Sequence, residues 1–505
     1  MKKVKAVLLA AMSMLVFPLA ACSDEQPVSN KGSVNQGDSN IFPYSSRVNG
    51  NVYMGDVMPF YDNGVMSIYH LQDKVGSRYM FYHPISRLTT SDYITYKDEG
   101  IALNFEEDIA SPDAALGTGS FIKGTDGKYH CFYTGHFAEK PAGGHQEVIR
   151  HAVSSDGQKT WVKDNDFNIE GTSDDFRDPY VYYDNADSCY YMLVTTRRSD
   201  KGVIDRYKST SLDAEASGWT YEGIFFENDE GTYNMECPSY LEYNGYWYLA
   251  YSEQGNNRVT HYRYQTEKGG EWKKFALDSI DSAGFYAGRL EKAGDKLYAF
   301  AWCAKLTNGD TGDFDWGGNL VAHEIKQGEN GELTAVMVSG YKDAFSTPIN
   351  YYRKNGEKVS SFSFTGETFQ AYGVEPLSKN ITRMHFTVKL DTLKGDFGLT
   401  FGMDGTYDNR LGSRVLAFHG ETGRLNCYND VRNILRYNSE LTGVNFAFAA
   451  GTEYDVDLLI DGQIVVVYLD NKVAMSMRFA DIQEKGFAFY SNGTKATVGG
   501  ISFYE

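Results

Sequence analysis

Short apolar and aromatic stretches, separated by polar turns, recur along residues 41–340. Each repeat holds a first extended stretch, a turn and then an aromatic stretch, and the repeats follow one another at intervals of roughly 50 to 65 residues. Aromatic residues favour strands, whereas Gly and Asn favour the turns between them. The pattern therefore predicts five units, each with an aromatic second strand: Met66–Tyr69, Tyr129–Tyr133, Tyr190–Leu193, Trp247–Ala250 and Leu297–Phe300.

Further strands follow the second strand in some units. A third strand is visible at Val148–Ser154 and at Val259–Tyr264. Four-stranded units repeated five times are typical of a propeller, in which the first strand of every blade lines a central channel. A long sandwich or a β-helix is the alternative, but a β-helix repeats at much shorter intervals. We therefore expect an all-β fold, with a five-bladed β-propeller over residues 41–340.

The pattern changes at about residue 345, where apolar and alternating strands follow one another closely. Asp461-Gly462 and Asp470-Asn471 lie between such strands and are hairpin signals. This spacing predicts an antiparallel β-sandwich over residues 345–505, to which we assign no chemistry because its charged residues are scattered. The strands expected there include Met384–Val388, Phe397–Phe401, Tyr454–Ile460 and Ile464–Leu469.

The composition narrows the range of partners. The 505 residues include 38 Tyr and 30 Phe, and they carry a formal net charge of −19. This acidity argues against nucleic acid and other phosphate-rich partners, because like charges repel. It is compatible with a neutral substrate such as a sugar, although solubility alone would explain it equally well.

The cysteines and histidines indicate neither a disulfide framework nor a metal site. His83, His136 and His145 lack the spacing of metal ligands, so we expect no catalytic metal and no cofactor. Beyond Cys22, the remaining cysteines are odd in number and show no paired spacing, and we interpret them as small core residues. They are Cys131, Cys189, Cys237, Cys303 and Cys427.

The N-terminus resembles an export signal. Residues 1–22 combine a basic start, an apolar run too short to span a membrane, and Leu19-Ala20-Ala21-Cys22, which resembles the bacterial lipobox. We expect a lipoprotein signal peptide over residues 1–22, lipidation at Cys22 and a flexible tether over residues 23–40. The protein would then be lipid-anchored to the bacterial outer membrane, with a glycan-uptake system as a candidate partner. A plain signal peptide with an incidental Cys is the alternative.

Acidic residues stand at similar points of three units. Arg177-Asp178-Pro179 opens the third unit, Glu236-Cys237-Pro238 opens the fourth, and Asp56 lies in the first. Because first strands converge on the channel of a propeller, these three acids should meet there. A single Asp at such a place is more often a solvated loop residue, and we interpret Asp281 in that way. Three acids in register indicate a shared site. Small, hydroxyl or aromatic groups would flank it from residues 116–121 and 285–287.

With these motifs the chain resembles glycoside hydrolase family 32, the fructan hydrolases and invertases. Arg177-Asp178-Pro179 and Glu236-Cys237 carry most of the resemblance, which covers nearly all of the chain after the signal. The family's first motif reads W-M-N-D-P-N-G, whereas residues 53–59 here read Y-M-G-D-V-M-P. Gly55 therefore replaces an Asn, which removes a hydrogen-bonding side chain beside the reacting sugar. The other matching segments are residues 119–120, 126–135, 285–287, 316–318 and 323–324.

The resemblance implies a retaining hydrolase that cleaves fructosyl linkages in fructans such as levan and inulin, or in sucrose-type sugars. Asp56 would be the nucleophile and Glu236 the general acid and base. Asp178 would bond the sugar hydroxyls and stabilise the oxocarbenium-like state. Arg177, beside Asp178, could hold it ionised and bond a sugar hydroxyl. Further candidates for substrate binding are His70, Ser120, Tyr286 and Trp316.

Two properties of the site follow from this chemistry. The working carboxyls of a retaining site lie about 5–5.5 Å apart, compared with roughly 6.5–9.5 Å in an inverting site. We also expect a raised pKa for Glu236, because a neighbouring carboxylate disfavours its charged form.

Two other functions stay open. An arabinan- or xylan-directed five-bladed hydrolase would share the three acids but invert the configuration of the product. Alternatively, the altered first motif has removed catalysis, and the propeller only binds glycans for a transport system.

Overall fold

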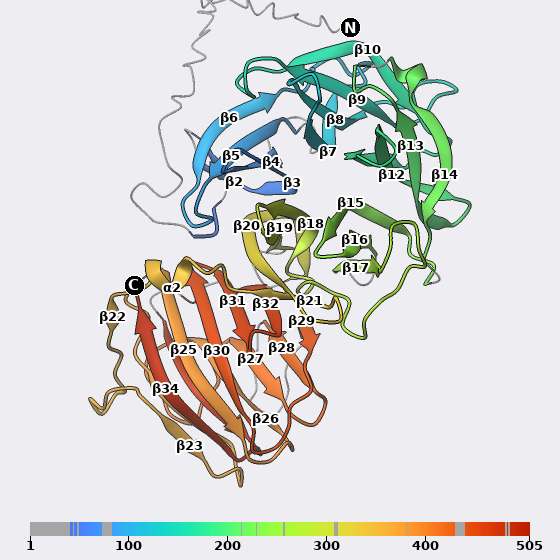
Figure 1. Cartoon of the computed structure of the whole chain (residues 1–505). Coiled ribbons are helices and arrows are strands. Elements are labelled where there is room, and N and C mark those ends of the chain that lie inside the picture. Colours follow the sequence, from blue (N-terminus) through green and yellow to red (C-terminus); the bar gives the residue numbers. More distant parts are fainter. Residues whose placement is uncertain are drawn as a thin grey trace, which may run out of the picture.

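The computed structural model describes residues 41–505 except 44, 48–49, 73–82, 214, 229, 256–257, 308–311, 380, 430–439, 480–481 and 483–484. It confirms the predicted fold class, an all-β chain in which a five-bladed β-propeller is followed by a β-sandwich (Figure 1). Among the described residues, no helix is both long and apolar enough to cross a membrane. The expected signal peptide, Cys22 and the tether lie outside the described residues.

The first three blades follow one another along the chain, and each begins with its inner strand. Blade 1 contains β3 (Met54–Asp62), β4 (Val65–Gln72), β5 (Ile85–Thr90) and β6 (Lys97–Leu103). Blade 2 contains β7 (Ala115–Lys123), β8 (Tyr129–His136), β9 (Glu147–Ser154) and β10 (Val162–Glu170). Blade 3 contains β11 (Phe176–Asp184), β12 (Cys189–Arg198), β13 (Lys201–Ser209) and β14 (Thr220–Phe226).

The last two blades complete the ring. Blade 4 contains β15 (Asn234–Tyr243), β16 (Tyr246–Gln254) and β17 (Thr260–Gln265). Blade 5 contains β18 (Tyr286–Ala293), β19 (Lys296–Leu306), β20 (Phe314–Gln327) and β21 (Leu333–Val336). Gly318 of β20 pairs with Met54 of β3, which joins blade 5 to blade 1. The predicted aromatic second strands lie in β4, β8, β12, β16 and β19.

All five inner strands carry the same irregularity. In each of them two residues oppose one residue of the second strand, which is a β-bulge. Asp178, Cys237 and Ala287 adopt φ angles of 57°, 54° and 55° within their bulges, a conformation that such residues seldom adopt. A bulge bends the strand and re-aims the side chains beside it. The bulged pairs are Gly55-Asp56, Gly117-Thr118, Asp178-Pro179, Cys237-Pro238 and Ala287-Gly288.

Hydroxyl side chains on the inner strands tie neighbouring blades together. Ser120 Oγ in blade 2 accepts the N–H of Val181 in blade 3 at 2.9 Å. Ser239 Oγ in blade 4 accepts the N–H of Leu290 in blade 5 at 3.0 Å. Because the edge of one inner strand does not pair with the next along its length, such bonds satisfy buried N–H groups that would otherwise be costly.

The sandwich consists of two antiparallel sheets around an apolar core. The first sheet has the order β22 (Pro348–Ile349), β34 (Ala496–Tyr504), β25 (Ile381–Leu390), β30 (Glu453–Asp461), β31 (Ile464–Leu469) and β32 (Val473–Arg478), and β23 (Phe362–Phe364) also pairs with β34. The second has the order β24 (Gln370–Val374), β33 (Gly486–Asn492), β26 (Asp396–Met403), β27 (Arg414–His419), β28 (Arg424–Tyr428) and β29 (Glu440–Asn445). The predicted hairpins at residues 461–462 and 470–471 are confirmed.

A few short elements lie outside the blades and the sandwich. They are β1 (Ser45–Arg47), β2 (Gly50–Val52), the 3-10 helix η1 (Ala216–Gly218) and helix α2 (Tyr341–Ala344). The five described cysteines are free and buried, in agreement with their interpretation as core residues.

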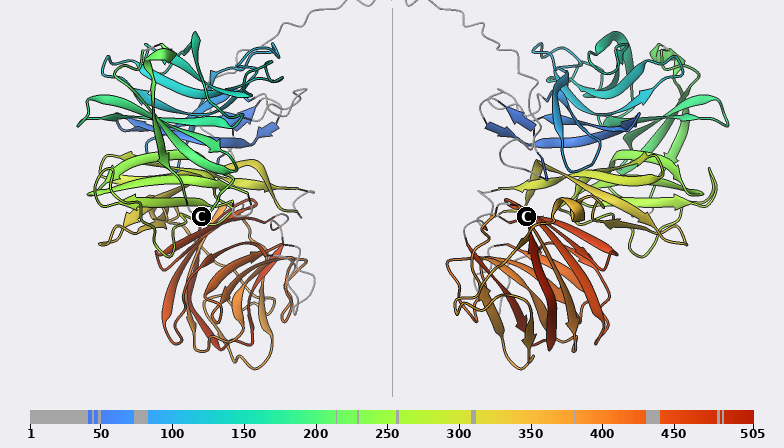
Figure 2. Two further views of the ribbon diagram at one scale, coloured as in Figure 1. Left: turned by 90° about the vertical axis from the view of Figure 1, so that its right-hand side faces the viewer. Right: turned by 60° about the vertical axis from the view of Figure 1, so that its left-hand side comes forward.

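The sandwich packs against blade 5 through its first sheet (Figures 1 and 2). Asp281 lies in a loop, as we expected, but it is at the centre of this contact with only 2% of its surface exposed, and so it is not solvated. Its carboxylate accepts the N–H and the hydroxyl of Ser476 at 2.8 and 2.6 Å and lies 2.9 Å from Nε2 of His323. Burial raises the pKa of Asp281, but the bonds from His323 and Ser476 outweigh it and hold this pKa below its ordinary value.

We predict that Asp281→Asn weakens the contact between the domains. The amide can accept only with its oxygen, so at least one donor now faces an NH2 group, at a cost of about 1–3 kcal/mol. Calorimetry should show a lower midpoint of thermal unfolding, whereas Asp295→Asn, at an exposed position, should leave it unchanged. An unchanged midpoint in Asp281→Asn would show that the two domains do not depend on this carboxylate.

Candidate active site

The bulges bring the three predicted acids to one end of the channel. Glu236 stands just before its bulge, Asp178 is the first bulged residue and Asp56 is the second. The acids therefore occupy three successive register positions, and not the equivalent positions that the sequence pattern suggested. They still act on one another, because the charges of both Glu236 and Asp56 disfavour ionisation of Asp178.

Asp56 accepts hydrogen bonds from two neutral donors. Thr118 Oγ1 donates to Oδ2 at 2.7 Å, and Trp302 Nε1 donates to Oδ1 at 3.1 Å. Thr118 is the second bulged residue of blade 2, and Trp302 lies on β19 opposite Tyr286. These donors come from two different blades, so they fix the orientation of the carboxylate from two sides.

Glu236 is held by one hydroxyl and one guanidinium. The hydroxyl of Tyr286 donates to Oε2 at 2.5 Å, while Arg177 donates to Oε1 from Nε at 3.2 Å and from Nη2 at 3.0 Å. The ring of Tyr286 packs edge-on against Trp302, with centroids 5.4 Å apart. The ring that donates to Glu236 is therefore in contact with the ring that donates to Asp56.

Arg177 is saturated by protein acceptors. Besides Glu236, it donates from Nη1 to Asp175 at 2.7 Å and to Glu147 at 3.0 Å, and from Nη2 to Gln254 at 3.2 Å. A guanidinium has five N–H groups, and these bonds use all of them. Arg177 therefore positions Glu236 in this structure, and its expected bond to a sugar hydroxyl stays a prediction.

Asp178 is set into the space between blades 2, 3 and 4. Its own N–H donates to Thr134 Oγ1 at 2.9 Å, and its Oδ2 accepts the N–H of Cys237 at 2.9 Å. Only 3% of its surface is exposed. Burial raises the pKa of Asp178 to about 7, against the opposing charge of Arg177.

Burial is also the largest cause of the raised pKa of Glu236. Arg177 and Tyr286 oppose this rise, and the charge of Asp56 adds to it. The direction of this pKa shift agrees with the expectation from the sequence, although the neighbouring carboxylate contributes less to it than desolvation does. Burial and the neighbouring carboxyls thus favour the protonated forms of Asp178 and Glu236, because each carboxylate disfavours ionisation of the others.

The other predicted residues divide into two groups. Tyr286 and Trp316 lie beside the acids. Ser120 holds the backbone of blade 3, and His70 is fully buried on β4, where its ring Nδ1 lies 3.2 Å from the carbonyl oxygen of Ile68. Burial lowers the pKa of His70 to about 4. Both residues are thus placed within the packing of the blades, and their expected contact with a sugar stays a prediction.

Trp316 explains why residue 55 is a glycine. A Cβ atom at Gly55 would lie 2.1 Å from Cζ2 of Trp316, far inside the contact distance. The indole also stacks on His83, with ring centroids 4.4 Å apart. An indole therefore occupies the space beside Asp56 that a side chain at residue 55 would need.

Sequence reasoning missed several residues of this cluster. Trp302 lies on a second strand, Glu147 begins a third strand and Asp175 precedes an inner strand, whereas the acids that we compared between the units all lie on inner strands. The sequence did contain a signal for Trp302. Tyr286 was already a candidate, and the residue that pairs with Tyr286 on the second strand must lie at the same end of the channel.

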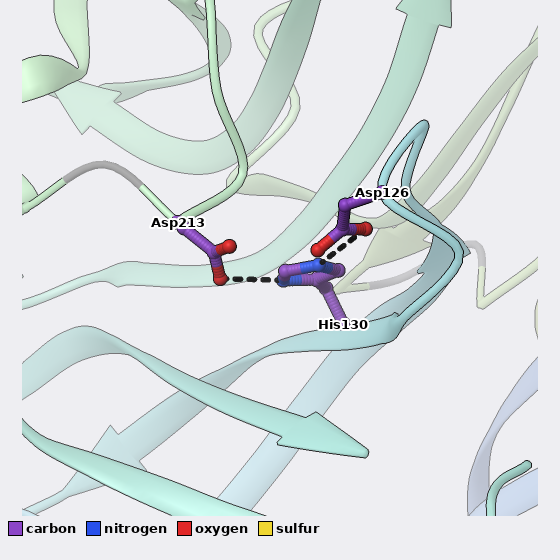
Figure 3. Close-up of side chains that lie close together, drawn as sticks. All are labelled: Asp126, His130 and Asp213. Carbon is purple, nitrogen blue, oxygen red and sulfur yellow. Dashed lines mark ion pairs between the residues drawn. The ribbon is translucent and has the colours of Figure 1, made fainter. Parts of the chain in front are cut away.

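Two clusters of His and Asp residues lie apart from the acids. Asp126, His130 and Asp213 meet at the end of blade 2 opposite the bulge, and Figure 3 shows one carboxylate at each edge of the imidazole. Lys128 Nζ lies 3.3 Å from Asp126 and 3.0 Å from Asp213. The ammonium group of Lys128 thus bridges these two carboxylates and offsets part of their charge.

The second cluster lies on the sandwich. His385, Asp455 and Asp457 come within reach of one another there. Arg383 Nη2 lies 2.6 Å from Asp457, and this bond again supplies a positive charge from the protein. Neither cluster shares a residue with the three acids.

Comparisons with known proteins agree with a carbohydrate-cleaving propeller. A model of the glycosyl hydrolases family 32 N-terminal domain matches residues 59–333. The chain belongs to glycoside hydrolase family 32. The match includes Asp178 and Glu236 and begins three residues after Asp56, where the first motif departs from the family pattern.

Among curated proteins, the chain is similar to a sucrose-6-phosphate hydrolase of Vibrio alginolyticus, with 26% identity over 41% of this chain and 40% of that protein. It is also similar to a levanbiose-producing levanase of Geobacillus stearothermophilus, with 23% identity over 62% of this chain and 83% of that protein. The alignment thus spans less than half of the first relative.

Solved structures show the same fold. A GH32 beta-fructofuranosidase of Bombyx mori has a TM-score of 0.66 and 17% identity, over 90% of this chain and 91% of that chain. An exo-inulinase of Aspergillus awamori has a TM-score of 0.69 and 13% identity, over 92% of this chain and 98% of that chain.

We predict that Gly55→Asn disrupts the site and that Trp316→Ala relieves part of the damage. The new side chain would collide with the indole, and the double variant provides space for it. A cycle of single and double variants should give a favourable coupling on the order of 1 kcal/mol in the free energy of unfolding. Gly499→Asn, at a strand position where an added Cβ would meet only Thr387 Oγ1 at 3.4 Å, is the matched control and should show no coupling to Trp316→Ala. Additive effects would contradict the contact.

We predict that Asp178→Asn stabilises the protein at alkaline pH. The unfolded chain loses this proton near 3.8 and the folded chain near 7, so the folded state holds more protons between these values and stability falls as pH rises through them. The variant has no such proton to lose. At pH 8 the free energy of unfolding of the variant should exceed that of the wild type by on the order of 1 kcal/mol or more. This difference should shrink towards pH 4.

Denaturant titrations at several pH values measure this difference. Asp200→Asn, at an exposed position, should show no such dependence on pH. A gain that stays constant from pH 4 to pH 8 would mean that Asp178 is not protonated in the folded protein.

Proposed function

We propose that this protein is a retaining glycoside hydrolase that cleaves fructosyl linkages in fructans or in sucrose-type sugars. Asp56 acts as the nucleophile, Glu236 as the general acid and base, and Asp178 as the partner of the sugar hydroxyls. Membership of family 32 supports a glycosidase, and the levanase and sucrose-6-phosphate hydrolase among its relatives support a fructosyl substrate.

The observation that carries the proposal is the different surroundings of the two carboxyls. Asp56 accepts bonds from the neutral donors Thr118 and Trp302, which orient its carboxylate without pairing it with a cation. Glu236 has only 15% of its side chain exposed and a raised pKa, so it retains a proton for the leaving group more readily than a solvated Glu would. Two carboxyls with such different environments are the usual basis for dividing acid and nucleophile roles.

The reaction proceeds in two steps. First, a carboxylate oxygen of Asp56 bonds to the anomeric carbon while the glycosidic bond breaks, and the proton of Glu236 passes to the leaving oxygen. Second, Glu236 takes a proton from water, whose oxygen attacks the same carbon and displaces Asp56. Each step inverts the configuration, so the product retains it.

Tyr286 can remain bonded to Glu236 through both steps. A phenol hydroxyl donates to the ionised carboxylate, and it can accept from the protonated acid after rotation of its hydrogen. The short bond of 2.5 Å therefore holds the carboxyl in place in either protonation state.

We predict that Asp56→Asn and Glu236→Gln each lower fructose release by a factor of about 10² or more, because the first removes the nucleophile and the second removes positioned acid–base catalysis, which alone contributes that much. Purified protein would be incubated with levan, inulin, sucrose and arabinan, and released sugars would be measured by chromatography. Glu242→Gln, on the same strand as Glu236 and half-exposed, is the matched control and should retain activity.

Two results would overturn the proposal. One is the absence of fructose release from every fructan by the wild type, which favours a glycan-binding propeller. The other is release that both variants leave unchanged. The configuration of the first product, followed by NMR, separates a retaining enzyme from an inverting one.

A further inference from the structure

Asp126, His130 and Asp213 connect two blades at the end of blade 2 that lies opposite the bulge (Figure 3). Asp126 lies in the turn between β7 and β8, His130 is the second residue of β8, and Asp213 follows β13 of blade 3. One atom from each side chain, a ring nitrogen or a carboxylate oxygen, lies within 4.8 Å of the other two. The proposed mechanism uses none of these residues.

The imidazole of His130 presents a nitrogen that lacks a hydrogen bond. The ring is fully buried, and within the described part of the chain its Nε2 has no hydrogen-bond partner. This nitrogen lies 3.7 Å from Oδ1 of Asp126, which is too long for a hydrogen bond. Two ligands of one tetrahedral ion, each bound at about 2.0–2.2 Å, lie roughly 3.3–3.6 Å apart. The two atoms are therefore spaced more like two metal ligands than like a donor and an acceptor.

A glycine leaves room beside these two atoms. A Cβ atom at Gly124 would lie 2.5 Å from Oδ1 of Asp126 and 3.2 Å from Nε2 of His130. The φ angle of Gly124 is outside the left-handed region, so the backbone alone does not require a glycine there. The missing side chain instead keeps the space next to both candidate ligand atoms open.

His151 orients the ring of His130. Its Nε2 lies 3.0 Å from Nδ1 of His130, and burial lowers the pKa of both rings, that of His151 to about 4. Both rings are thus neutral, and the ring that donates in this bond has a lone pair on its other nitrogen. That lone pair faces a carboxylate, either Asp126 from Nε2 of His130 or Asp164, at 3.8 Å, from Nδ1 of His151. A cation beside Nε2 would select the first arrangement, in which His130 donates away from the ion, as metal-binding histidines usually do.

Lys128 contacts the same two acids from the solvent side. Its Nζ lies 3.3 Å from Oδ2 of Asp126 and 3.0 Å from Oδ2 of Asp213. Because both contacts are to Oδ2 atoms, the ammonium group leaves Oδ1 of Asp126 and Nε2 of His130 facing each other. Lys128 is partly exposed and flexible, so a divalent ion can compete with it for the acids.

We propose that these residues form a structural site for one Zn²⁺ ion. Nε2 of His130 and the carboxylates of Asp126 and Asp213 are the ligands, and water completes the coordination. Imidazole together with carboxylates suits Zn²⁺, whereas Ca²⁺ prefers roughly six to eight oxygen ligands. The ion joins blade 2 to blade 3 away from the three acids, so this inference does not depend on the proposed function.

The test is calorimetric titration of the full chain with ZnCl2, after a chelator has removed bound metal. Asp126→Asn and Asp213→Asn, at partly exposed positions, should each raise the Kd for Zn²⁺ about tenfold or more, since losing even an indirect partner of a metal costs that much. Lys128→Met should instead lower this Kd about tenfold, because it removes the competing charge. Glu227→Gln, which removes an exposed carboxylate paired with Lys201, should leave the Kd unchanged.

Three results would overturn the inference. The first is the absence of Zn²⁺ binding, or a Kd that the variants of Asp126, Asp213 and Lys128 leave unchanged. The second is binding that Asp455→Asn removes and Asp126→Asn leaves intact, which would place the ion in the cluster on the sandwich. The third is tighter binding of Ca²⁺ than of Zn²⁺ in a parallel titration with CaCl2. Titration of the folded protein is preferred to thermal unfolding, because unfolding exposes five cysteines that also bind Zn²⁺.

Discussion

The end of the propeller channel crowds acidic side chains around one guanidinium. Arg177 bonds Glu236, Glu147 and Asp175 at once, and the charge of Asp178 also acts on it. Several carboxylates in a buried space repel one another, so an arrangement of this kind is stable only with a cation at its centre and with fixed hydrogen bonds around it. The backbone of blade 3 that presents Arg177 depends on this balance, and so does the orientation of Glu236.

The repeated bulge makes this crowding possible. Each blade places one residue at or just before its bulge in the cluster, and small changes of position along the strand select which residue that is. The three acids use three successive positions, and the remaining two blades place Thr118 and Tyr286 against Asp56 and Glu236. The site is therefore a property of the closed ring of blades, and no single blade holds it.

The sequence allowed prediction of the parts whose signals are local. Aromatic strands separated by turns predicted the blades, and the hairpins at residues 461–462 and 470–471 predicted the sandwich. The motifs Arg177-Asp178-Pro179 and Glu236-Cys237 located two of the acids. The contacts that depend on closure could not be predicted in this way: Trp302 reaches Asp56 across 246 residues of chain, and Asp281 meets Ser476 across 195. Ser120 shows the same limit of prediction from sequence. A hydroxyl on an inner strand can bond the backbone of the neighbouring blade as well as a sugar, and the sequence does not distinguish the two.

The altered first motif is best understood together with the second domain. At Gly55 the chain lacks a side chain beside Asp56, and the indole of Trp316, from blade 5, fills that space. Blade 5 is also the blade that packs against the sandwich, through Asp281 and His323. The ring that shapes one side of the reacting centre and the bonds that hold the sandwich thus belong to the same part of the propeller. A change in either domain at this contact would therefore act on the shape of the site without touching an acid.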